Sequence, residues 1–144
     1  MTTKQPLPAG HHLLFFAFTN VGPGGTCSLQ GYPGVQFRRN DTDTGPMPFT
    51  LVDHGGVVIT SNPPSKVLVK VGQTVFAAID KQDCVKGNNG LGPLVRVTVP
   101  GNPTITELNV PGDFTVTLCD SGDPGNTVDV SPFVPTGRDA VVVR

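Results

Sequence analysis

Short runs of apolar and β-branched residues, broken by glycine and proline, recur along the chain. In Lys66–Val71 every odd position is valine, and in Phe114–Cys119 apolar residues alternate with threonines. A period of two places one face of a strand against a core and the other in water. Thr74–Ile79 is nearly all apolar, as in a central strand. These patterns predict strands at residues 12–19, 26–30, 34–39, 56–60, 66–71, 73–80, 93–99, 104–109, 113–119, 126–131 and 139–143.

Turn-forming residues separate these runs. Asn89-Gly90, Pro111-Gly112 and Pro100–Pro103 stand between predicted strands, and no window combines helical periodicity with a capping signal. Short strands at this spacing predict an all-β fold, an immunoglobulin-like Greek-key β-sandwich in a single domain, with a small closed barrel as the alternative. We assign residues 1–10 to a flexible N-terminal arm and residues 11–144 to the sandwich domain.

The composition gives the size class of the chain and argues against nucleic-acid and membrane partners. With 144 residues the chain is long enough for one domain with a buried core. Its 10 basic and 11 acidic residues give a net charge of −1, so we expect no nucleic-acid partner and no attraction to an anionic membrane. No run of about 18 apolar residues is present, and we predict no transmembrane segment. His12–Phe18 lacks the flanks of a signal peptide and is interpreted as a strand.

Three cysteines cannot all pair within one chain. Cys84 follows the 73–80 strand and Cys119 ends the 113–119 strand, and we favour a disulfide between them, which implies an oxidising compartment outside the cytoplasm. Cys27 is then a free thiol or is paired outside this chain. The alternative is that all three are reduced core residues. No Cys-x-x-Cys pair is present and no histidine stands at ligand spacing from a cysteine, so we predict no metal site and no cofactor.

One stretch of the chain resembles a known family. Thr19–Gly22 and Cys27–Val35, which contains Gly31-Tyr32-Pro33-Gly34, are similar to the Thr-Asn-x-Gly and Pro-Cys-Thr-Leu-x-Gly-Tyr-Pro-Gly-Val segments of an actinobacterial family of exported proteins and lipoproteins, the domain of unknown function DUF4232. Thr26 stands in place of the family's proline and Ser28 in place of its threonine. The likeness continues more loosely through Val69–Ala77 to about residue 135.

The resemblance implies an exported, immunoglobulin-like β-sandwich. It brings no known catalytic residues, so none is carried over to this chain. Relatives often have another cysteine upstream, and this chain has none before Cys27, which leads us to expect a trimmed N-terminus. We interpret Gly31, Tyr32, Pro33 and Gly34 as a structural turn, with Tyr32 packed over the edge of the sandwich.

Two other patterns could carry chemistry. His54, next to Asp53, could serve a hydrolase with Ser61, Ser65 or Ser131 as nucleophile, but no Gly-x-Ser-x-Gly elbow presents a serine. Residues 40–45 offer oxygen ligands for calcium, but the further carboxylates and the final glutamate of an EF-hand are missing, so we predict a solvated hairpin loop. Residues 120–125 look like a flexible loop.

These observations favour a non-enzymatic module of the bacterial cell envelope or secreted space. We expect it to bind an unknown protein or cell-envelope component through loops or sheet edges, as a monomer or weak homo-oligomer. The alternatives are a hydrolase that uses His54, or a structural domain that self-associates through Cys27.

Overall fold

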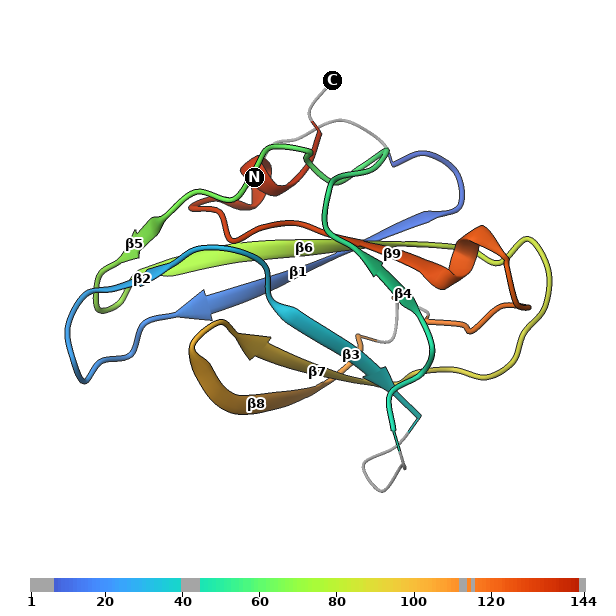
Figure 1. The fold of residues 1–144 in the computed structure, drawn as a ribbon, viewed down its shortest axis with the longest axis horizontal. Coiled ribbons are helices and arrows are strands. Elements are labelled where there is room, and N and C mark those ends of the chain that lie inside the picture. The colour runs from blue at the N-terminus through green and yellow to red at the C-terminus, as the bar shows by residue number, and fades with distance from the viewer. Residues whose placement is uncertain (1–6, 40–44, 112–113, 115, 143–144) are drawn as a thin grey trace.

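A computed structural model of the chain describes residues 7–39, 45–111, 114 and 116–142 (Figure 1). This part of the chain is all-β, as the alternating pattern predicts, with two short 3-10 helices. The strands are β1 (His11–Thr19), β2 (Cys27–Leu29), β3 (Gly34–Arg38), β4 (Thr50–Val52), β5 (Val67–Val69), β6 (Thr74–Gln82), β7 (Leu94–Val99), β8 (Asn102–Asn109) and β9 (Thr127–Val130). The helices are η1 (Pro124–Asn126) and η2 (Gly137–Ala140).

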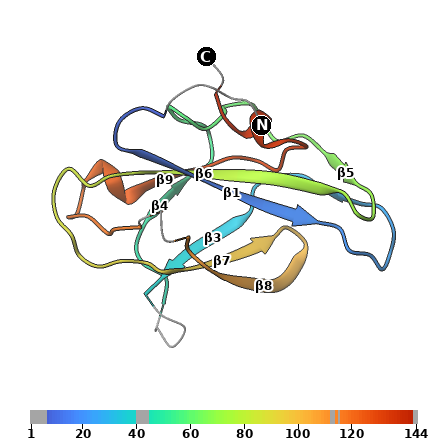
Figure 2. The ribbon, with the colours of Figure 1, turned by 180° about the vertical axis from the view of Figure 1, so that it is seen from behind.

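The strands form three sheets (Figures 1 and 2). The largest has the order β1-β6-β9-β4, in which β1 pairs with β6 antiparallel over nine residues and β4 joins β9 in parallel. The second has the order β3-β7-β8, and both of its pairings are antiparallel. The third is the short antiparallel pair of β2 and β5.

The two larger sheets share one hydrophobic core. The alternation in β3 buries Val35 and Phe37, and that in β7 buries Val95 and Val97. These side chains belong to one buried cluster with Phe16, Ile79, Val128 and Val130 of the four-stranded sheet. Full burial of a Val, Leu, Ile or Phe side chain contributes about 1.5–3 kcal/mol, so this cluster is the main stabilising contact between the sheets.

Two smaller clusters attach the remaining segments. One joins Val67 and Val69 of β5 to Val75 and Ala77 of β6 and to Phe133. The other lies on the opposite face of β6, where Ile59, Ala78 and Ala140 are fully buried together. The loop before Ile59 and the helix η2 therefore cover the outer face of the four-stranded sheet.

The strand predicted at residues 56–60 is wrong. Only Ile59 makes a β-bridge there, with Val141. The chain from Gly56 to Ile59 bends back on itself, and the Gly56 N–H donates a hydrogen bond of 3.1 Å to the Ile59 carbonyl. The strand β4 lies earlier, at Thr50–Val52, and was not predicted. It has only three residues, and it gains its hydrogen bonds from β9, far away in the sequence, which a local pattern does not reveal.

Two other predicted strands are irregular. Residues 113 and 115 of the strand predicted at 113–119 lie outside the described part of the chain. In the rest of it, the only β-bridge joins Thr117 to Leu91. Phe114, Val116 and Leu118 are buried, as the alternation predicts. The partner segment 90–93 is rich in glycine and proline, which does not sustain a regular ladder. Residues 137–140 form η2 rather than the start of a 139–143 strand.

Candidate functional site

An apolar groove lies where the edges of the sheets approach one another. It has a volume of about 490 Å³ and is lined by residues 15–19 of β1, Cys27 and Leu29 of β2, Val97 and Val99 of β7, and Thr106 and Leu108 of β8. None of these side chains is charged. Leu108 of β8 is 45% exposed, so the groove is open to solvent at this strand.

The groove is bordered by strands that end their sheets. Among the described strands, β1 has β6 as its only neighbour and β8 has only β7. The alternation along β1 turns Phe16 and Phe18 toward the core clusters, so the inner side of this edge is apolar. An edge strand keeps hydrogen-bonding groups on its outer side that no other strand uses. The groove therefore combines apolar contact surface with backbone groups that can accept a further strand.

The Thr19–Gly22 segment positions one end of the groove. The Asn20 side chain donates hydrogen bonds to the carbonyls of Gly25 and Val69, at 2.9 and 2.8 Å, and accepts one from the Gly22 amide at 2.9 Å. Gly22 has a φ of +75°, which favours glycine. These bonds hold the turn after β1 so that β2 begins beside the end of β1.

Cys27 is exposed, carries a free thiol and lies on the rim of the groove. Its partner residue in the ladder is Val69 of β5. The alternative in which all three cysteines are reduced core residues is therefore wrong, because Cys27 is exposed and Cys84 is bonded to Cys119.

The Gly31–Gly34 turn connects β2 to β3 and docks onto the sheets. The Gly31 carbonyl accepts a hydrogen bond of 3.0 Å from the amide of Phe133, and Pro33 is buried. A β-carbon at Gly34 would collide with the Thr98 side chain of β7. Tyr32 is partly exposed, and burial, followed by the negative charge of Asp53, raises the pKa of its phenol.

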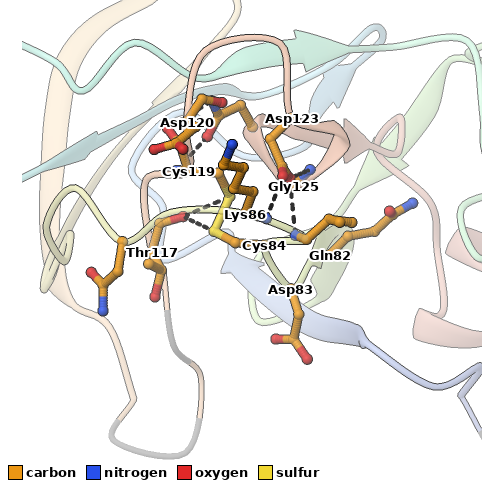
Figure 3. The surroundings of a disulfide bond; sticks show 12 residues. Gln82, Asp83, Cys84, Lys86, Thr117, Cys119, Asp120, Asp123 and Gly125 are labelled. Carbon is orange, nitrogen blue, oxygen red and sulfur yellow. Dashed lines mark hydrogen bonds between the residues drawn. A yellow bond between two sulfur atoms is a disulfide. The ribbon is translucent and has the colours of Figure 1, made fainter.

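The favoured disulfide is present: Cys84 and Cys119 are joined at a sequence separation of 35 (Figure 3). It links the loop after β6 to the loop that precedes η1. Asp123 strengthens the same junction, because its carboxylate accepts hydrogen bonds from the amides of Val85, Lys86 and Gly125 at 3.2, 2.7 and 2.8 Å. Desolvation raises the pKa of Asp123, but these amides outweigh it and hold the pKa below the ordinary value.

Hydrogen bonds of Asp123 therefore tie the segment 120–125 to the loop after β6, a connection that the sequence pattern did not indicate. Asn126 adds to it by accepting a hydrogen bond of 2.7 Å from the Cys119 amide and donating to the carbonyls of Cys119 and Asp120. The side chains of Asp123 and Asn126 are the groups that hold this loop.

The structure does not assemble the hydrolase constellation. Ser131 is fully buried, and its hydroxyl accepts a hydrogen bond from the Ala78 amide at 2.8 Å and donates one to the Pro132 carbonyl at 2.9 Å. Ser61 lies with its backbone against Gly55, whereas Ser65 lies beside a different cleft. No hydrogen bond joins His54 to a serine among the residues that the structure describes.

A pair of carboxylates was missed by the sequence analysis. Asp80 of β6 and Asp129 of β9 face each other across the ladder, and the imidazole of His11 lies 2.7 Å from the Asp80 carboxylate. Within the described ranges no three His, Cys, Asp or Glu side chains could hold a metal ion together. The calcium hypothesis at residues 40–45 lies outside this part of the chain except for Gly45.

Comparison with known proteins places the chain in a family without giving it an activity. In the described part of the chain no helix has the length and apolarity needed to cross a bilayer. No curated protein and no solved structure matches the chain. The pattern of a family described as a domain of unknown function, DUF4232, matches residues 1–134 of 144. The chain belongs to the DUF4232 family.

Proposed function

We propose that this chain is a non-enzymatic module that binds an extended apolar segment of a partner protein along the groove between β1 and β8. In this proposal the fold is an immunoglobulin-like Greek-key sandwich. The shared core of the two larger sheets and their largely antiparallel pairing support that assignment. The Cys84–Cys119 disulfide supports a location in the cell envelope or secreted space, where disulfides persist.

The observation that carries the proposal is the uncharged groove between two sheet edges. A peptide in extended conformation can continue a sheet by hydrogen bonding to an unpaired edge, while pockets for alternate side chains provide specificity. The groove offers both components, with the outer edges of β1 and β8 on either side and Phe16, Phe18 and Val97 among its lining residues. Its volume of about 490 Å³ would accommodate a few side chains rather than a whole domain.

A peptide selection tests the proposal directly. A library of random peptides displayed on phage would be selected on the immobilised protein, and the selected peptides would be synthesised and titrated into isotopically labelled protein. We expect sequences that alternate apolar and polar residues and contain no proline in the apolar stretch. Their binding should shift the amide resonances of β1 and β8.

Two single substitutions give the matched comparison. Leu108→Lys places a charge in the groove at an exposed position of β8 and should weaken peptide binding at least tenfold. Val71→Lys alters a similarly exposed apolar residue outside the groove and should leave binding unchanged. A peptide whose shifts map to the loops instead of β1 and β8, or equal binding by the two variants, would contradict the proposal.

A further inference from the structure

One carboxylate of the four-stranded sheet is buried and incompletely bonded. Asp80 is 1% exposed, and its Oδ2 lies 2.7 Å from Nδ1 of His11. Its Oδ1 is buried and has no hydrogen-bond partner among the described residues. An unsatisfied oxygen on a buried carboxylate is costly, and such groups in native structures need an explanation.

Asp129 provides a second carboxylate at the same place. It is the register partner of Asp80 in the antiparallel pairing of β6 and β9. Side chains of directly opposite residues lie on the same face of a sheet, with β-carbons about 5 Å apart. Burial, followed by the charge of Asp80, raises the pKa of Asp129, whereas His11 and His54 act in the opposite direction.

A loop lies directly on this pair. A β-carbon at Gly56 would overlap the Asp129 carboxylate, so no side chain larger than hydrogen fits between the loop and the acid. The loop then continues to Ile59, which is fully buried against Ala78 of β6. We call the segment from Asp53 to Val58, which lies against the Asp129 carboxylate at Gly56, the cover.

The groups around the pair favour a proton as its ligand. The charged or titratable groups that act on Asp129 are Asp80 of β6, His11 of β1 and His54 of the cover. Because no three potential ligands in the described residues could hold a metal ion, a bound metal does not explain the orphan oxygen. Two carboxylates that face each other across a ladder are coupled when their charges interact, and one of them is then favoured in its protonated form.

We propose that Asp129 holds a proton that it donates to Oδ1 of Asp80, and that loss of this proton releases the 53–58 cover from the sheet. With the proton in place the pair is hydrogen-bonded and carries one negative charge, which His11 balances when it is protonated. Without the proton, two negative charges face each other beside the cover, and the partly exposed Asp129 gains fuller hydration when the cover moves away. The arrangement acts as a latch that opens as the pH rises.

The wild-type protein provides the first test. Its carboxyl carbon resonances would be followed by NMR from pH 3 to pH 8, together with hydrogen exchange of the amides in the 53–58 cover, corrected for the intrinsic effect of pH. We expect Asp129 to titrate above the usual range for aspartate. We also expect protection of the cover to fall about tenfold or more through the same transition, since one pKa unit of coupling corresponds to a factor of ten.

Three variants separate the latch from a general effect of pH. Asp129→Asn mimics the protonated acid and should keep the cover protected at every pH. Asp80→Asn removes the facing charge, so Asp129 should titrate at lower pH than in the wild type. Asp83→Asn removes an exposed acid that pairs with His12 at 2.7 Å, and it should change neither readout. Unchanged titration of Asp129 in Asp80→Asn, or wild-type protection of the cover that does not depend on pH, would overturn the proposal.

Discussion

The disulfide should contribute a large part of the stability, and its removal has a calculable effect. The bridge closes a loop with a sequence separation of 35 residues. In the chain-entropy model, the entropy lost by cross-linking an unfolded loop of this size is about 13 cal/mol/K, which is about 4 kcal/mol at 25 °C. The hydrogen bonds of Asp123 join the same two loops without the sulfurs, so the folded junction should persist when the cysteines are replaced.

The perturbation is the double substitution Cys84→Ala/Cys119→Ala, measured by urea unfolding. With a denaturant slope of about 2 kcal/mol/M, a loss of about 4 kcal/mol lowers the midpoint by about 2 M. The slope itself should rise, because the unfolded chain without the cross-link exposes more surface. Cys27→Ala alters an exposed free thiol and should leave the midpoint unchanged.

Reduction of the wild-type protein supplies an independent check. Wild type unfolded with reductant should match the double variant, and wild type without reductant should match Cys27→Ala. A loss below about 1 kcal/mol in the double variant would refute the reasoning. It would show that the unfolded chain holds these loops together without the disulfide.

Three further substitutions test the packing, the hydrogen bonding and the buried charge, each by urea unfolding. Gly125→Ala should cost about 1–3 kcal/mol of stability because its β-carbon would lie 2.6 Å from Sγ of Cys119. The control Gly45→Ala, with open space around it, should change stability by less than about 0.5 kcal/mol. Equal effects of the two substitutions would contradict the steric argument. Ser131→Ala should cost about 1–3 kcal/mol because it leaves the buried amide of Ala78 without its acceptor, and a neutral result would mean that another group replaces the hydroxyl. Burial lowers the pKa of the Lys81 ammonium below its ordinary value of 10.5, although nearby acids act in the opposite direction. Just below pH 10.5 the folded protein therefore binds fewer protons than the unfolded chain, and its stability should rise with pH in that range. Lys81→Met should remove this slope, and a slope that survives the substitution would assign it to another group.

The sequence indicated most of the strands because their burial follows a local rule. Val67 and Val69 of β5, and Val95 and Val97 of β7, keep the period of two in their burial, whereas Val71 lies beyond the end of β5 and is exposed. The apolar run Thr74–Ile79 lies in β6, an inner strand of the four-stranded sheet, with the neighbours expected of a central strand. Such patterns depend on the chemistry of adjacent residues, which the sequence displays directly.

The parallel strand β4 escaped prediction for the opposite reason. Thr50–Val52 is too short to show a period, and its pairing with Thr127–Asp129 depends on how the sheets come together. The groove is similar, because it exists only where β1 and β8 end without a further partner.

The carboxylate pair could have been suspected in part. Asp80 and Lys81 directly follow the apolar run that predicts a central strand, which is a poor place for two charges. That signal indicates a buried ionisable group, and both side chains are 1% exposed. It does not reveal Asp129, which lies 49 positions later in the sequence and reaches Asp80 only through the pairing of β6 with β9.

The parallel pairing of β4 with β9 has a consequence for how the molecule is made. The ladder of β4 can form only after Thr127–Asp129 of β9 has been synthesised, and the ladder of β1 only after β6 has been synthesised. As the chain emerges from N- to C-terminus during synthesis, the first half has few of its final neighbours available, and closure over such long separations is slow. A nascent chain stopped before residue 127 contains β1 to β8 but leaves β4 without its partner and one side of β6 open, so these strands should stay accessible to proteases until β9 is added.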